Sequence, residues 1–330
     1  MFVTVTIQTY NHADSLRRTL ESLGELHCPA GSDYEILVVD NNSTDNTAGV
    51  VLECQTMLGA RLRSVFESRQ GLSHARNRAI AEARGELICF IDDDVIVDPG
   101  WLAGHINAYH ADARTVAVGG RVLLHWTDGC VRPAWLTSDL EGFLGRVDLK
   151  ADESIMRFPR YPFGCNMSVR RDIAQQVGGF CPLLGRTKAN LMSNEEKLFF
   201  YEVHLRNGRV AYAPEALVHH AVSPSRLSKR FFLRRAYAQG VSDIIFFNRM
   251  KPGGRTFMWH LRQVAVATCF AGGALAMAGV RCIPGVRRPG LFSLVRAGYL
   301  LGYAVQAAKG RTASQQTLDQ LKGAWKGVCG

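Results

Sequence analysis

An apolar segment followed directly by three aspartates constrains the fold of this chain more than any other feature. Leu87–Ile91 reads LICFI, which predicts a buried central strand, and Asp92, Asp93 and Asp94 follow without a break. A carboxylate costs several kcal/mol to bury without a partner, so the three acids are expected where this strand leaves its sheet. Two carboxylates spaced as Asp92 and Asp94 can share Mg²⁺ or Mn²⁺, which prefer oxygen ligands. A solvated acidic turn is the alternative interpretation.

Strands and helices alternate through the first hundred residues, which predicts an α/β fold with a doubly wound, mostly parallel sheet. Further strands are expected at Phe2–Gln8, Glu35–Val39 and Leu62–Phe66. Helices are expected at Asp14–Leu23, in the segment that ends at Leu52 and at Ser73–Ala83. Polar residues follow three of the strands: Tyr10 and Asn11, Asp40, and Asp92–Asp94. In open α/β sheets ligands bind at the carboxyl ends of the strands, so this edge is the expected site.

Several motifs in the same order resemble the family 2 glycosyltransferases, which have the GT-A fold. They are TYN (9–11), VVDNNSTD (38–45), GLSHARN (71–77), FIDDDV (90–95), FGCNMSVRRDIAQQVGGF (163–180), NEEKLFFYEVHLRNG (194–208) and YAPEALVHH (212–220). The resemblance covers roughly residues 1–222. It implies a GT-A domain with a nucleotide-sugar half at about 1–100 and an acceptor half at about 101–222. It also implies an inverting reaction.

The resemblance assigns the donor side of the reaction to the first half of this domain. It implies that the segment Thr9, Tyr10 and Asn11 holds the nucleotide together with Asp40, and that Arg76 supplies a cation near the base or pyrophosphate. Asp92 and Asp94 would place a divalent cation, Mg²⁺ or Mn²⁺, on the diphosphate, with Asp93 beside the donor. His220 would reach either this metal or a phosphate. A helix-capping role for Asp40, a solvated Arg76 and a structural His220 are the alternatives.

An acceptor hydroxyl needs a base, and the resemblance places that base at Glu195 or Glu196. This chain departs from the family pattern, because it has Glu where Asp is usual and one extra residue before Gly208. We favour Glu196. Two acids that complement the dipole at a helix start are the alternative. Gly164, Asn166 and Met167 are expected to shape the acceptor pocket.

Positive charge is concentrated at the end of the chain. The net charge is +10, and from Ala221 onward 17 Lys and Arg stand against only Asp243 and Asp319. Apolar stretches at Val264–Val280 and Leu291–Ala308 follow a basic, aromatic segment. We therefore expect 223–330 to be a basic helical region that associates with an anionic membrane surface, at the cytoplasmic face of the cell membrane. A shallow hairpin, a monotopic anchor and two spans all fit this pattern.

The remaining features narrow the function class. Nine cysteines, with no C-x-x-C pair, argue against a disulfide framework or zinc site and favour a reducing setting. No signal peptide is evident before the first strand.

We expect a metal-dependent inverting transferase that moves a sugar from a nucleotide-sugar donor to a glycan or lipid-linked acceptor, in cell-surface polysaccharide or glycolipid synthesis. A nucleotidyltransferase would need a glycine-rich phosphate-binding loop after the first strand. The segment at that place, TYNHAD (9–14), contains no glycine. A nucleic-acid-binding protein would not need cations beside long apolar runs, so no nucleic-acid partner is expected.

Overall fold

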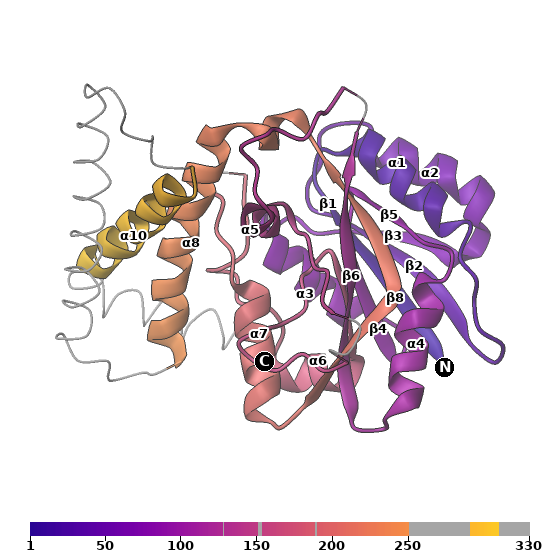
Figure 1. Cartoon of the computed structure of the whole chain (residues 1–330). Coiled ribbons are helices and arrows are strands. Elements are labelled where there is room, and N and C mark those ends of the chain that lie inside the picture. Colours follow the sequence, from indigo (N-terminus) through magenta and orange to yellow (C-terminus); the bar gives the residue numbers. More distant parts are fainter. Residues whose placement is uncertain (128, 151–153, 189, 251–290, 310–330) are drawn as a thin grey trace, which may run out of the picture. The chain divides into compact units, whose positions relative to one another are not determined.

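The computed structural model describes residues 1–127, 129–150, 154–188, 190–250 and 291–309 (Figure 1). The chain divides into two compact units. The first contains Met1–Arg132, Glu141–Lys188 and Glu195–Ser223, and the second contains Pro133–Leu140, Ala189–Asn194 and everything from Pro224 onward.

The first unit is built on an eight-stranded sheet in the order β3-β2-β1-β4-β7-β6-β8-β5. The pairs β1–β2, β2–β3, β1–β4 and β6–β8 are parallel, and the pairs β4–β7, β6–β7 and β5–β8 are antiparallel. The strands are β1 (Phe2–Thr9), β2 (Asp33–Asp40), β3 (Leu62–Phe66), β4 (Leu87–Asp92), β5 (Val95–Val97), β6 (Thr115–Trp126), β7 (Asn166–Arg170) and β8 (Arg209–Val222). The predicted α/β sheet is confirmed, and β1 to β4 of the first hundred residues form a parallel block within it.

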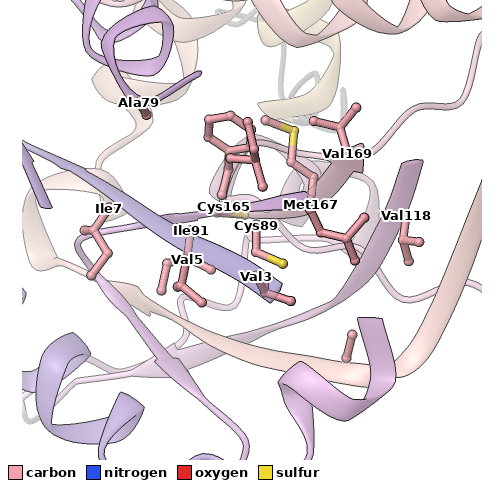
Figure 2. Close-up of a cluster of buried hydrophobic side chains, with 14 of the residues drawn as sticks. Val3, Val5, Ile7, Ala79, Cys89, Ile91, Val118, Cys165, Met167 and Val169 are labelled. Carbon is pink, nitrogen blue, oxygen red and sulfur yellow. The ribbon is translucent and has the colours of Figure 1, made fainter. Parts of the chain in front are cut away.

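Helices cover both faces of this sheet (Figure 1). Figure 1 shows α1 (Ala13–Leu23), α2 (Thr47–Leu58) and α4 (Trp101–Ala111) on one side, and α3 (Leu72–Glu82), α6 (Arg171–Val177) and α7 (Glu195–Leu205) on the other. A short helix, α5 (Ser138–Glu141), follows β6. Because a sheet covered on both faces has no wet side, the central strands β1 and β4 are buried along almost their whole length. Val3, Val5 and Ile7 of β1 and Ile91 of β4 belong to this core (Figure 2).

The second unit contains the long helices α8 (Lys229–Met250) and α10 (Leu291–Lys309), which pack against each other. The helical region predicted after the sheet is therefore present. Of the helices in the described ranges, none combines the length and the apolar character that crossing a membrane requires. The apolar run Val264–Val280 lies outside the described residues.

Candidate active site

The predicted polar edge forms because β1, β2 and β4 are parallel. Thr9 is in register with Asp40, and Gln8 is in register with Asp92, so the three strands end side by side. Asn11 has a φ of 53° and accepts a hydrogen bond at its Oδ1 from the backbone N–H of Thr44, at 2.7 Å. The structure thus brings together the strand ends on which the donor-side residues were predicted.

Asp40 and Thr9 have clear local roles at this edge. Asp40 Oδ1 accepts a hydrogen bond from the backbone N–H of Ser43 at 2.9 Å, and the Asp40 side chain remains partly exposed. This bond shapes the turn after β2. It is not the helix-capping role given above as the alternative, because the N-cap residue of α2 is Asn46. Thr9 is only 2% exposed, whereas Tyr10 beside it is half-buried. Of these donor-side residues, Tyr10, Asn11 and Asp40 are partly exposed and Thr9 is buried.

Asp92, Asp94 and His220 form a cluster that could hold a metal ion. One ligand atom from each residue lies within 4.8 Å of the others. The pairing of β5 with β8 builds this cluster, because Val95 lies opposite His220, and His220 Nε2 is 3.2 Å from Asp94 Oδ1. Two carboxylates and an imidazole form a donor set that suits a divalent transition-metal ion such as Mn²⁺. The residues present therefore fit the cation that the motif predicts.

The middle aspartate of the triplet has a different partner. Asp93 is 7% exposed, and its Oδ1 lies 3.1 Å from Nδ1 of His12, on the loop after β1. Asp93 and Asp94 form the turn between β4 and β5, and of the two only Asp94 has a ligand atom beside those of Asp92 and His220. His12 is a site residue that sequence reasoning missed, although its place directly after TYN could have singled it out.

Gln8 was also missed. It is 6% exposed, and in the part of the chain that the structure describes neither its amide nitrogen nor its amide oxygen has a hydrogen-bond partner. It is the second-to-last residue of β1, before Thr9, and is paired in register with Asp92. Its signal in the sequence is a glutamine that follows the apolar and β-branched residues of FVTVTI.

Arg76 lies at the centre of the carboxylates. Its guanidinium is 1% exposed, 2.9 Å from Glu196 Oε1, 3.2 Å from Glu195 Oε1 and 3.6 Å from Asp92 Oδ1. Burial would lower the pKa of Arg76, but the Glu196, Glu195 and Asp92 charges raise it. We predicted a cation near the base or pyrophosphate. The structure gives Arg76 three carboxylate partners, which act as counter-ions for its buried charge.

The two adjacent glutamates beside Arg76 have different pKa values. Burial and the neighbouring Glu196 charge raise the pKa of Glu195 to about 8, against the effect of Arg76. Burial also acts to raise the pKa of Glu196, but the charge of Arg76 and a hydrogen bond from it lower that pKa overall. The Glu195 side chain is 3% exposed and that of Glu196 is 16% exposed. Near neutral pH the pair therefore holds a protonated Glu195 and an ionised, more accessible Glu196.

The three residues expected at the acceptor pocket divide into two groups. A Cβ added at Gly164 would lie 1.9 Å from Arg76 Nη2 and 2.4 Å from Glu196 Oε1, so this backbone lies directly against the charged cluster. Asn166 is 1% exposed and accepts a hydrogen bond at Oδ1 from the Trp101 indole N–H, at 2.8 Å. Figure 2 shows Met167 among the buried apolar side chains. The side chains of Asn166 and Met167 are thus buried and support β7 from within the core.

Known proteins resemble this chain in sequence. The model of the family described as Glycosyl transferase family 2 matches residues 4–178. The succinoglycan biosynthesis protein ExoM of Rhizobium meliloti (strain 1021) is 26% identical over 92% of this chain and 93% of that protein. The glucosyl-dolichyl phosphate glucuronosyltransferase of Haloferax volcanii is 26% identical over 73% of this chain and 76% of that protein.

Solved structures resemble the fold. The mannosyltransferase PcManGT from Pyrobaculum calidifontis, in complex with GDP-Man and Mn²⁺, matches with a TM-score of 0.59 at 21% identity. That match covers 95% of this chain and 87% of the other. Staphylococcus aureus TarS 1–349 in complex with UDP matches with a TM-score of 0.51 at 19% identity, over 95% of this chain and 92% of the other. Because the family model spans more than half of the chain and the strand edge carries the family's motifs, this protein belongs to glycosyl transferase family 2 and is a glycosyltransferase with a GT-A fold.

Proposed function

We propose that this enzyme transfers a sugar from a nucleoside-diphosphate sugar to a hydroxyl of a glycan or lipid-linked acceptor, with inversion and with the help of a divalent cation. The cluster of Asp92, Asp94 and His220, with ligand atoms within 4.8 Å of one another, is the observation that carries this proposal. The PcManGT structure, titled as a complex with GDP-Man and Mn²⁺, supports the class of donor and cation. The name of ExoM, a succinoglycan biosynthesis protein, supports a role in cell-surface polysaccharide synthesis.

Each half of the site has a separate task in this proposal. Asp92, Asp94 and His220 would hold the cation, which when bound neutralises charge on the diphosphate. Tyr10, Asn11 and Asp40 lie at the adjoining strand ends, where they would bind the nucleotide. Thr9 is buried and would support this segment through the strand.

Glu196 is the base that this arrangement favours. Its pKa is lowered beside Arg76, so it is ionised near neutral pH and can accept the proton of the acceptor hydroxyl. The hydroxyl oxygen forms a bond to the anomeric carbon while the bond from that carbon to the phosphate oxygen breaks. The proton moves to the Glu196 carboxylate, and the nucleoside diphosphate departs with the bonding electrons. One in-line displacement of this kind inverts the anomeric configuration.

The second unit would hold the enzyme at the cytoplasmic face of the cell membrane. The exposed cations of α8 include Lys229, Arg230 and Arg234, which suit anionic headgroups. Leu301 on α10 is a large apolar side chain that is 54% exposed. Cations and exposed apolar groups on the helices of one unit favour a surface-bound mode of attachment.

A thermal-shift experiment tests the donor and cation assignment. Ligands that bind only the folded protein raise its stability, by about 2.7 kcal/mol at 100 times Kd. We expect UDP or GDP to raise the Tm of the wild type in Mn²⁺ but much less in EDTA. Asp94→Asn should lose the Mn²⁺-dependent shift, while Asp172→Asn, an exposed acid on α6, should keep it. Equal nucleotide shifts in Mn²⁺ and EDTA would contradict the cation assignment.

A further inference from the structure

The loop after β1 is anchored on both sides of His12. The backbone N–H of Asn11 donates to Ser43 Oγ at 3.1 Å, and the backbone N–H of Ala13 donates to Asp45 Oδ2 at 2.9 Å. Ser43 and Asp45 both belong to the loop that follows β2. Because these bonds come directly before and directly after it in the chain, the backbone of His12 is held against a neighbouring strand end within the first unit.

From this anchored loop, the side chain of His12 reaches the turn between β4 and β5. His12 Nδ1 lies 3.1 Å from Asp93 Oδ1, and an ionised carboxylate can only accept, so Nδ1 donates the hydrogen bond. The Asp93 side chain is 10% exposed, whereas that of His12 is 53% exposed. A largely buried carboxylate is costly to leave without a donor, while an exposed imidazole can bond to water. The bond therefore fixes Asp93 more than it fixes His12.

Asp93 lies between two residues of the cluster that could hold a metal ion. It follows Asp92, the last residue of β4, and precedes Asp94 in the turn. One peptide bond joins Asp93 to each of these carboxylate residues, and peptide bonds are planar and stiff. A displacement of Asp93 therefore moves the backbone from which the Asp94 ligand extends toward Asp92 and His220. Pairing within the sheet holds Asp92 itself, so the turn is the part of the cluster that needs a further support.

We propose that His12 is a positioning residue that holds Asp93 and thereby sets the affinity of the Asp92, Asp94 and His220 cluster for a divalent cation. In this role His12 needs to contact neither the cation nor the donor. Partners that orient metal ligands typically change metal affinity by about 10- to 100-fold when they are replaced. This inference rests on the proposed function, and it makes the loop after β1 a support for the cation as well as a part of the nucleotide edge.

Two substitutions of His12 separate its hydrogen bond from the shape of its ring. His12→Phe keeps a ring but has no donor, whereas His12→Asn carries a donor nitrogen at the δ position and can still bond Asp93. Neither variant removes a side-chain cap of α1, because His12 makes no such bond. Free Mn²⁺ measured by electron paramagnetic resonance gives the Kd of the full chain. We expect His12→Phe to raise this Kd by about 10-fold or more and His12→Asn to stay within about 3-fold of wild type. His110→Phe, at an exposed histidine of α4, is the matched control and should keep the wild-type Kd.

Nucleotide binding separates positioning from direct contact with the donor. Calorimetry with UDP or GDP, whichever binds the wild type more tightly, should give the same Kd for His12→Phe and wild type in EDTA. In Mn²⁺ the nucleotide should bind His12→Phe more weakly than wild type. Weaker nucleotide binding in EDTA as well would assign His12 to the nucleotide itself and overturn the positioning role.

A double-mutant cycle tests whether His12 acts through Asp93. Asp93→Ala should also weaken Mn²⁺ binding, and adding His12→Phe to it should weaken binding no further. Additive losses would overturn the proposal, as would a folded His12→Phe with the wild-type Mn²⁺ affinity. If Asp93→Ala does not fold, as judged by its Tm, the comparison of His12→Phe with His12→Asn decides the question. A wild type whose Mn²⁺ binding is unchanged by Asp94→Asn would instead overturn the cation site of the proposed function.

Discussion

At the scale of residues, two adjacent glutamates acquire different protonation states because they share one cation. Arg76 is nearer to Glu196 than to Glu195, at 2.9 and 3.2 Å. Two carboxylates that share a site cannot both ionise easily, so the better-paired one keeps the charge. The result is one protonated and one ionised carboxyl group beside the cluster that suits a divalent cation.

This protonation difference predicts a pH-dependent stability. The folded protein raises the pKa of Glu195 from its ordinary value of 4.5 to about 8. Between these values the folded state binds a proton that the unfolded state has lost, so stability falls as pH rises. Glu195→Gln removes the loss of stability that Glu195 causes as the pH rises. Its free energy of unfolding, relative to wild type, should rise by up to about 1.4 kcal/mol per pH unit across this window. Urea unfolding at about pH 5.5 and about pH 7.5 measures the difference, and parallel pH profiles would contradict it.

Gly164 supplies a second residue-scale prediction. An added Cβ would collide with Arg76 and Glu196, so Gly164→Ala must displace the charged cluster or the loop that carries this glycine. Overpacking of this kind typically costs about 1–3 kcal/mol, and here it acts on the proposed base. We expect steady-state assays to show a loss of at least about 10-fold in kcat. Gly142→Ala is the matched control, because an added Cβ there meets nothing within 4 Å. Equal activity in the two variants would contradict the role of this contact.

At the scale of elements, the parallel half of the sheet could be predicted from sequence. The strands β1, β2 and β4 are rich in apolar or β-branched residues and end in polar residues, and helices separate the strands along the chain. Parallel strands joined by such helices place their carboxyl ends at one edge, which locates Asp40 and Asp92 without a structure. The observed register of Thr9 with Asp40 follows from this logic.

The other half of the site depends on long-range pairing that local patterns do not encode. His220 reaches Asp94 because β5, a strand of three residues, pairs with the distant β8. A strand this short gives little periodic signal. The resemblance to family motifs, not the pattern of residues, was what indicated His220.

The burial of Arg76 and Asn166 is also not encoded in local sequence patterns. Both are polar residues that a sequence reader would place at the surface or at a ligand, yet each is only 1% exposed. Arg76 is buried because carboxylates from β4 and α7 surround it, and Asn166 because Trp101, Arg121 and Ala216 satisfy its amide. Partners from distant segments determine both outcomes.

At the scale of the whole molecule, charge divides the chain into an acidic part and a basic part. Residues from Ala221 onward carry a net charge of +15, and the preceding residues carry −5. Each cation near an anionic membrane surface contributes on the order of 1 kcal/mol to binding, and apolar insertion adds to it. This asymmetry is the main support for our proposal that the second unit attaches the enzyme to the membrane.

The attachment can be measured by sedimentation. We expect the full chain to pellet with membranes, to stay there in high salt because apolar insertion persists when charges are screened, and to be released by detergent. Replacing Lys229, Arg230 and Arg234 with glutamine should reduce binding to anionic vesicles at low salt. Full-length protein in the high-speed supernatant at low salt would contradict membrane attachment.

The central claim is that Glu196 takes the proton of the acceptor while a separate cluster holds the donor. The most direct test measures acceptor-dependent release of nucleoside diphosphate by the full chain, in Mn²⁺, for wild type and Glu196→Gln. We predict that Glu196→Gln loses at least about 10²-fold of this rate. Its affinity for the donor, measured by calorimetry, should stay near that of wild type. A Glu196→Gln enzyme that releases the diphosphate at the wild-type rate would contradict this account.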